Sequence, residues 1–233
     1  MDPLIRTARV TGLLYLSLAI SGGLGFLLIR SRLYDPDDSA ATLANVLAHE
    51  SLARAGIAFE LLTVLTQALV AVWFYRLFHA ADRFAAGGIA AFGLANAVAI
   101  LSSAALLATA LDSALGGAPA STVQLLYGIS DNLWGVGALF FGLWLIPMGQ
   151  VVLRSRWLPG ALGWLLIAGG VGYVLSAFIR YLAPDAPPIA DILAFPATVG
   201  EFWMIGYLLL RGVRQQALDN PPTRNATPDP VAS

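Results

Sequence analysis

Residues 86–111 read AGGIAAFGLANAVAILSSAALLATAL, a run of 26 residues without a charged side chain. A helix rises about 1.5 Å per residue, so this run is longer than the roughly 30 Å hydrocarbon core of a bilayer. Strands of a membrane barrel need only about 10 residues of alternating polarity, whereas this run is apolar throughout. Helices also satisfy every backbone N–H and C=O group inside lipid. The run therefore predicts a transmembrane helix.

Five further apolar blocks have a similar length and lie at residues 8–29, 55–78, 133–153, 158–182 and 189–210. The composition agrees, because 58% of the residues are hydrophobic and 12% are charged, whereas about 25% are charged in soluble domains. The mean hydropathy is +0.74. We therefore predict an all-α integral membrane bundle of six transmembrane helices over residues 1–214. Four prolines among small polar residues predict that residues 215–233 form a disordered cytoplasmic tail.

The placement of arginine predicts the orientation of the bundle. All 13 basic residues are arginines, which together with abundant alanine and glycine is typical of a GC-rich bacterial genome. Nine of them lie on the N-terminal side of the predicted bilayer, and four lie on the other side, namely Arg30, Arg32, Arg54 and Arg180. Cytoplasmic loops carry the excess of basic residues. The sequence therefore predicts a bacterial cytoplasmic (inner) membrane protein with both termini in the cytoplasm.

Two outer loops contain helical patterns of their own. Asp35 is a suitable N-cap and Pro36 suits the first position of a helix, so we expect a short interfacial helix over residues 36–48 in the first outer loop. Residues 119–127 form a second, weaker example. Both segments could lie on the membrane surface or pack on the bundle as ordinary helical loops, and periodicity does not separate these alternatives.

The composition excludes several kinds of site and partner. The chain has no cysteine and two histidines, His49 and His79, so we expect no metal site and no cofactor. A net charge of −1 argues against nucleic acid as a partner. No zinc-protease, phosphate-loop or hydrolase-elbow motif is present. Gly22-Gly23-Leu24-Gly25 lies inside an apolar span, where it indicates close helix packing or a kink.

Short motifs are found in four parts of the chain: RVTGLLYL at residues 9–16, NVLAHESLAR at 45–54, RSRWLPGALG at 154–163 and Gly200-Glu201. With these motifs the chain resembles, over about residues 6–214, a bacterial family catalogued as domain of unknown function 4386. The resemblance implies a multi-pass membrane protein. It implies no activity, no cofactor and no catalytic residue.

Two carboxylates inside the spans are the first candidates for a site, because an ionisable side chain costs about 2.5–3.5 kcal/mol at mid-membrane. Glu201 lies about twelve residues into the sixth block, near the middle of the bilayer. Glu60 shares a helical face with Thr63 and Gln67, and this polar face should point into the bundle. Asn96 lies within the third block, and Asp131 and Arg180 lie near the outer ends of two others.

We predict an outward-facing polar cavity with Glu60 and Glu201 at its base and Arg180 or Arg54 nearby. The predicted site residues, for a ligand or a proton, are Glu60, Gln67, Glu201, Arg180, Asp131 and Asn96. Such a cavity suits a carrier or binding protein for a small molecule or cation, with the lipid bilayer as its surroundings.

Two alternatives remain for the same polar groups. In the first, they form interhelical hydrogen bonds and one buried salt bridge, as in a structural or regulatory subunit. In the second, Asp131 and His49 serve a membrane enzyme that acts on lipid at the outer leaflet. The oligomeric state is left open by the sequence.

Overall fold

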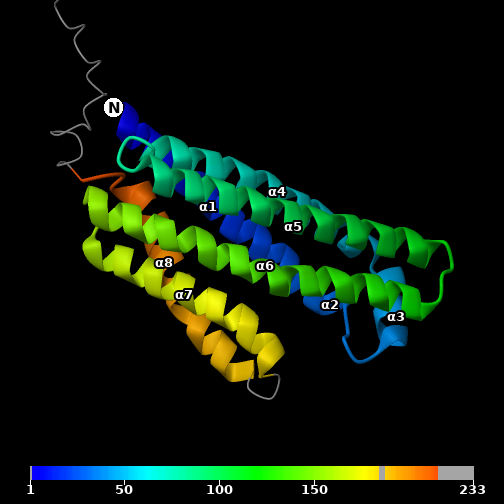
Figure 1. The fold of residues 1–233 in the computed structure, drawn as a ribbon. Coiled ribbons are helices and arrows are strands. Elements are labelled where there is room, and N and C mark those ends of the chain that lie inside the picture. Colours follow the sequence, from blue (N-terminus) through cyan, green and yellow to red (C-terminus); the bar gives the residue numbers. More distant parts are fainter. Residues whose placement is uncertain (1, 184–186, 215–233) are drawn as a thin grey trace, which may run out of the picture.

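A computed structural model describes residues 2–183 and 187–214, and this part of the chain is helical, with no strand. The helices are, in order, α1 (Pro3–Gly22), the π-helix η1 (Gly23–Arg30), α2 (Ser31–Leu33), α3 (Ser39–Ala48), α4 (Glu50–Phe78), α5 (Arg83–Leu115), α6 (Ala120–Ser155), α7 (Gly160–Leu182) and α8 (Pro187–Leu210) (Figure 1). The predicted tail at residues 215–233 lies outside the described residues.

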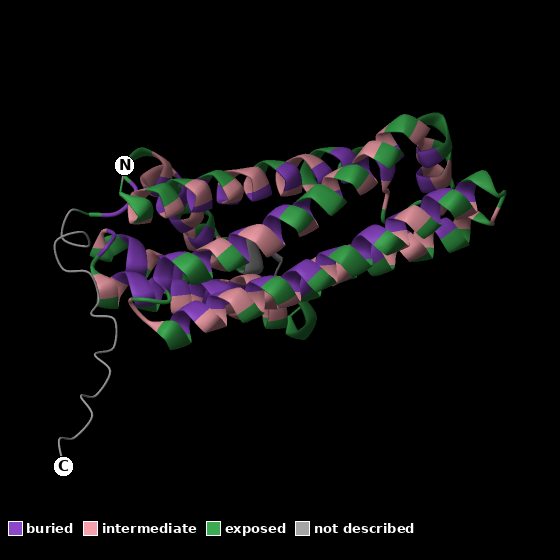
Figure 2. Cartoon of the chain, turned by 90° about the horizontal axis from the view of Figure 1, so that it is seen from above, coloured by how far each residue is buried: buried purple, intermediate pink, exposed green. Residues whose placement is uncertain are grey.

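Among the described residues, six helices are long and apolar enough to cross a membrane, which confirms the predicted six-helix membrane bundle. The first of them runs continuously from α1 through η1 to α2. Many large apolar side chains point outward, whereas a soluble monomer rarely exposes such a surface. Examples that are more than half exposed are Leu13, Leu65, Val98, Trp164 and Phe195. Figure 2 shows the same pattern, with exposed residues on the outside of the helices and buried ones between them.

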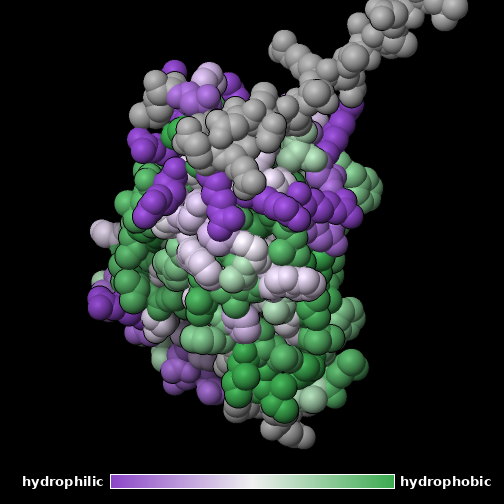
Figure 3. Space-filling model, turned by 90° about the vertical axis from the view of Figure 1, so that its left-hand side faces the viewer, coloured by the Kyte–Doolittle hydropathy of each residue, from purple (hydrophilic) through white to green (hydrophobic). Residues whose placement is uncertain are grey.

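One end of the bundle is rich in arginine. Figure 3 looks onto this end, which holds the N-terminus, and shows hydrophilic side chains gathered there beside hydrophobic ones. The spans alternate in direction, so the start of α1 meets the ends of α4, α6 and α8. Eight exposed arginines lie at or next to the helix termini at this end of the bundle: Arg6, Arg9, Arg76, Arg83, Arg154, Arg156, Arg211 and Arg214. Charge is therefore concentrated where a helix leaves the hydrocarbon.

The spans pack as antiparallel neighbours from α4 to α8, and α1 lies between α4 and α8. Aromatic rings fill the centre of this arrangement. Tyr15 of α1 makes edge-to-face contacts with Phe74 of α4 and Trp144 of α6, with ring centroids 5.4 and 5.5 Å apart. Such contacts favour one ring orientation. They fix the direction in which the Tyr15 hydroxyl points.

Glycines bring α6, α7 and α8 into backbone contact. A Cβ atom added at Gly142 of α6 would lie 2.5 Å from the carbonyl oxygen of Gly170 in α7. A Cβ at Gly169 would lie 2.4 Å from the Cα of Ala197 in α8. Small residues allow this approach in lipid, where close packing rather than the hydrophobic effect holds helices together.

The structure confirms the short helix in the first outer loop, and it corrects the predicted N-cap of that helix and the expectation for residues 119–127. The short helix is present as α3, but its N-cap is Asp38, whose Oδ1 accepts the N–H groups of Ala40 and Ala41, so the prediction of Asp35 was wrong. Asp35 instead accepts the N–H of Asp37 in a preceding turn. Residues 120–127 are not a separate helix but the first turns of α6, because no breaker separates them from the fourth span. α3 packs against this projecting part of α6.

Asp82, at the arginine-rich end, gives a first testable prediction. Its carboxylate accepts the N–H of Ala85 and pairs with Arg154, and both interactions hold the pKa of Asp82 below its ordinary value of 3.8. A lowered folded-state pKa means that the stabilisation is present above 3.8 and is lost as the pH falls through the lowered value. Asp82→Ala should lower the free energy of unfolding at neutral pH by about 0.5–2 kcal/mol.

Thermal unfolding in detergent at neutral and acidic pH measures this effect. The difference in melting temperature between wild type and Asp82→Ala should shrink at a pH well below 3.8. Asp37→Ala, at an exposed aspartate of the outer turn, is the matched control and should leave the melting temperature nearly unchanged. A gap that stays constant at all pH values would show that the carboxylate does not cap α5.

Candidate functional site

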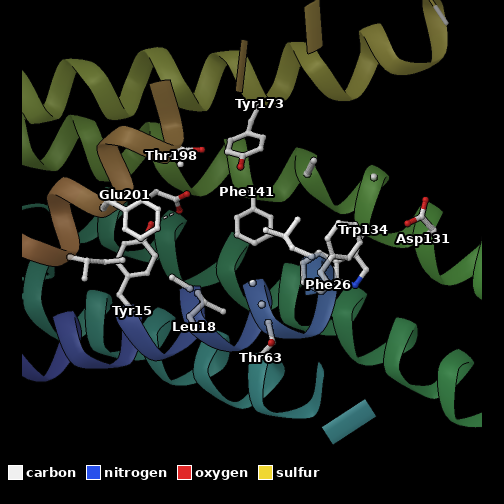
Figure 4. A pocket seen from close by; sticks show the side chains of 18 of the residues that line it. Tyr15, Leu18, Phe26, Thr63, Asp131, Trp134, Phe141, Tyr173, Thr198 and Glu201 are labelled. Atoms are coloured by element: carbon white, nitrogen blue, oxygen red, sulfur yellow. Dashed lines mark hydrogen bonds between the residues drawn. The ribbon is translucent and has the colours of Figure 1, made fainter. Parts of the chain in front are cut away.

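A cavity of about 400 Å³ lies within the bundle, between α1 and η1 on one side and α6, α7 and α8 on the other. α1 and α8 touch below it, where a Cβ at Gly12 would lie 2.9 Å from the Cβ of Leu208. Beyond Tyr15 the two helices are separated by the cavity. Figure 4 shows its two ends, with Glu201 and Tyr15 at one and Asp131 and Trp134 at the other.

Glu201 forms the closed end. The hydroxyl of Tyr15 donates a hydrogen bond to its Oε1 atom. Tyr173 of α7 and Thr198 of α8 lie beside it and also line the cavity (Figure 4). Glu201 is partly exposed, because one side of the carboxylate faces the open space. An acidic group thus faces a cavity within the membrane-spanning part of the molecule.

The opposite end of the cavity is polar, and its lateral wall is apolar. Asp131, whose side chain is 43% exposed, and the exposed Arg180 stand at the polar end. Arg180 lies against Gly135 of α6. Along the side, Leu27 and Phe202 line the cavity while 66% and 60% exposed. These two residues mark a lateral lip, between η1 and α8, where the cavity meets the lipid-facing surface.

Glu60 lies in a separate buried cluster and does not line the cavity. Arg30, 5% exposed, donates from Nη2 to Glu60 Oε1 at 2.5 Å, and Glu60 is 2% exposed. The same nitrogen lies 2.9 Å from Ser130 and 3.3 Å from Ser103. Asp131 approaches Nη1 of Arg30 at 3.8 Å. The cluster ties η1, α4, α5 and α6 together.

Trp134 forms the wall between the cluster and the cavity. Its indole N–H donates to Glu60 Oε1 at 3.2 Å. Its ring lines the cavity and packs on Phe26, with centroids 4.7 Å apart. The guanidinium carbon of Arg30 lies over the ring of Phe26, 5.0 Å from its centroid. An aromatic wall therefore separates the buried Glu60 from the cavity that Glu201 lines.

The π-helix η1 places Arg30 in the interior. It begins at Gly23, inside the glycine-rich run that predicted close packing or a kink. Gly25 allows η1 to approach α4, since a Cβ there would lie 3.1 Å from the Cβ of Phe59. The wider turn of a π-helix changes the direction of the residues that follow. Arg30 consequently faces Glu60 instead of the outer surface.

The remaining predicted residues lie deeper on α4 and α5. Gln67 and Asn96 are buried, and Asn96 Nδ2 lies 3.5 Å from Gln67 Oε1. They face each other away from the cavity, whose lining from α4 is Thr63. Of the six predicted residues, the structure places Glu201, Asp131 and Arg180 around the cavity. Glu60, Gln67 and Asn96 lie in the packed interior.

Sequence reasoning missed Tyr15, Arg30, Trp134 and Tyr173. Arg30 ends an apolar block, where an arginine usually extends to the membrane surface. The glycines at 22, 23 and 25 were the available signal that the helix is irregular before it. The aromatic residues carried no local signal, because aromatic side chains are common in any apolar span.

The residues of the enzyme alternative have other partners in the described part of the chain. His49 Nδ1 lies 3.1 Å from the carbonyl oxygen of Asn45, and Glu50 pairs with Arg54 at 2.7 Å on the surface. Asp131 faces Arg30 and the cavity. Within residues 2–183 and 187–214, no group of three or more His, Cys, Asp or Glu side chains is placed to hold a metal ion.

Comparison with known proteins gives a match to a protein family. The family described as "Domain of unknown function (DUF4386)" matches residues 10–212, which confirms the resemblance found in the sequence motifs. No curated protein and no solved structure matches the chain.

Proposed function

The chain belongs to the DUF4386 family of unknown function, and because the family supplies no activity, we propose from the cavity that it binds a lipophilic small molecule within the membrane, as a binding protein or carrier. The observation that carries this proposal is the cavity itself. Its volume of about 400 Å³ falls within the range of roughly 300–1,000 Å³ that small-molecule sites occupy. Its walls are mainly apolar and aromatic, with a few polar groups at the two ends.

The lateral lip supports entry from the lipid. Leu27 and Phe202 are exposed on the side of the bundle, where no charged residue lines the cavity. A lipophilic molecule dissolved in the bilayer could pass between η1 and α8 without first entering water. Its polar group would then reach Glu201, and a second polar group could reach Asp131 or Arg180.

We also propose that the protein lies in a bacterial inner membrane with both termini in the cytoplasm. The eight exposed arginines at one end support this orientation. The burial of Arg30 supports the same orientation, because its charge lies inside the bundle and not at the outer surface of the membrane. In this orientation the end of the cavity with Asp131 and Arg180 faces the outside.

The three predicted site residues that do not line the cavity, Glu60, Gln67 and Asn96, suit a structural role. Glu60 is neutralised by Arg30, and their cluster joins η1, α4, α5 and α6. Polar groups buried in this way hold helices together in lipid. We assign Glu60, Gln67 and Asn96 to packing and the cavity to ligand binding.

Filling the cavity tests the proposed function. Ala138 lines the cavity on α6, so the Ala138→Trp variant should occupy the space and abolish binding. A panel of lipophilic cationic, neutral and anionic compounds is screened by thermal unfolding in lipid nanodiscs. At about 100 times its Kd, a ligand should stabilise the wild type by about 2.7 kcal/mol and leave the filled variant unchanged.

Ala105→Trp is the matched control, because Ala105 is exposed on α5 and does not line the cavity. It should respond to the panel as the wild type does. If both tryptophan variants fold and no compound distinguishes the wild type from Ala138→Trp, the cavity does not bind small molecules and the proposal fails.

A further inference from the structure

We infer that the ligand of this cavity is a lipophilic organic cation whose charged group lies at Glu201. This inference rests on the proposed binding function and adds the chemical class of the ligand. It is carried by the contrast between the carboxylates of Glu60 and Glu201, by the aromatic lining and by the position of the nearest cations.

Glu201 lacks the counter-ion that Glu60 has. Glu60 is paired with Arg30, whereas within the described part of the chain no basic side chain lies within ion-pair distance of Glu201. Tyr15 is the hydrogen-bond donor to Glu201 among these residues. An unpaired charge in a low-dielectric interior is costly. A bound cation would supply the missing partner on the side that faces the cavity.

Aromatic rings line the cavity from Glu201 to its opposite end. Those that line the cavity are Tyr15, Phe26, Trp134, Phe141, Tyr173 and Phe202. The face of an aromatic ring attracts a cation, and the effect grows when the site excludes water. In Figure 4 the rings of Phe141 and Tyr173 lie between the two ends of the cavity, beside the path from Asp131 to Glu201. Apolar groups around a positive centre would contact these rings.

The basic residues of the site are placed where they do not oppose a cation at Glu201. Arg180 is exposed and stands at the other end of the cavity beside Gly135, where water or lipid headgroups can solvate it. Arg30 lies behind the wall of Trp134, and its charge is matched by Glu60 at 2.5 Å. The closed end therefore presents one acidic group and no competing positive charge.

A pair of ions with nearly the same size and shape tests the sign of the ligand's charge. Tetraphenylphosphonium and tetraphenylborate have similar size and shape and opposite charge, and triphenylmethanol is a neutral comparator. Binding of each to wild-type protein in nanodiscs is measured by equilibrium dialysis, with uptake by empty nanodiscs subtracted. We expect saturable binding of the phosphonium and markedly weaker binding of the other two. This comparison needs no variant.

The Glu201→Gln variant tests whether the charge of Glu201 is needed to bind the cation. Glutamine keeps the shape of the side chain and an oxygen that can accept the Tyr15 hydrogen bond, but it removes the charge. It should weaken phosphonium binding about tenfold or more. Glu50→Gln, at an exposed carboxylate outside the cavity, is the control and should keep wild-type affinity. Phe141→Leu, which removes one ring without touching Glu201, should weaken binding less.

The outcomes separate this inference from the proposed function. If the borate or the neutral compound binds as tightly as the phosphonium and Ala138→Trp abolishes that binding, the cavity is a ligand site and the cationic class is wrong. If phosphonium binding survives in a folded Glu201→Gln protein, the role given to Glu201 is wrong. If no compound binds in a manner that Ala138→Trp removes, both proposals fail.

Discussion

Replacing Arg30 with methionine should lower the free energy of unfolding by about 3–5 kcal/mol, since it leaves Glu60 as a buried carboxylate without its partner. Arg30 and Glu60 are 5% and 2% exposed, so neither can turn to water without opening the bundle. The substitution also removes the donor that Ser103 and Ser130 share. Methionine fills much of the same volume and fits an apolar span, so lost packing should contribute little.

The measurement is unfolding in mixed detergent micelles, with a second pair of residues as control. Arg54→Met breaks an exposed pair with Glu50, in which the side chains are 60% and 43% exposed. It should cost less than about 0.5 kcal/mol. Adding Glu60→Gln to Arg30→Met should recover part of the lost stability, because the unpaired charge is then gone. A loss for Arg30→Met no larger than that for Arg54→Met would show that the buried pair is not formed.

Gly169→Ala should disrupt the contact between α7 and α8. The added Cβ would lie 2.4 Å from the Cα and 2.5 Å from the N of Ala197. These are backbone atoms, so no flexible side chain can move aside, and the helices must separate. Overpacking of this kind costs about 1–3 kcal/mol. Because α8 carries Glu201, the separation should also weaken binding of any ligand in the cavity.

Gly206→Ala is the matched control on α8. A Cβ at that position meets nothing within 4 Å. The substitution should be neutral or should stabilise by about 0.5–1 kcal/mol, because alanine favours the helix. Thermal unfolding of both variants is the measurement. If Gly169→Ala melts at the temperature of Gly206→Ala, α7 and α8 are not in close backbone contact.

The spans could be predicted because their signal is local. A continuous apolar run, an arginine after it and a turn residue beyond are all contained in a short window of sequence. The burial of Glu60 and Gln67 followed from α-helical spacing on α4, which is regular. The same spacing fails on η1, where hydrogen bonds span five residues and rotate everything that follows. For that reason Arg30 was counted among the outer arginines.

Partners far apart in the chain could not be predicted either. Tyr15 and Glu201 are separated by 186 positions, and nothing near either residue indicates the other. Their contact depends on α1 lying next to α8, which depends in turn on packing at Gly12. The separation of Glu60 from Glu201 likewise depends on Trp134, whose position is set by the register of α6. These features arise only when the helices pack together, so no short stretch of the sequence indicates them.

The exposed lip at Leu27 and Phe202 affects how a measured dissociation constant must be expressed for this protein. In the proposed function, this lateral opening takes up ligand that is dissolved among the acyl chains. Occupancy is then governed by the mole fraction of ligand in the bilayer, which its partition coefficient multiplies far above the aqueous concentration. An apparent Kd expressed as total ligand per litre will shift when the amount of lipid is changed, because the lipid holds most of the ligand. The route of entry therefore affects the rates of binding and release, whereas the occupancy at a fixed free concentration is the same for either route.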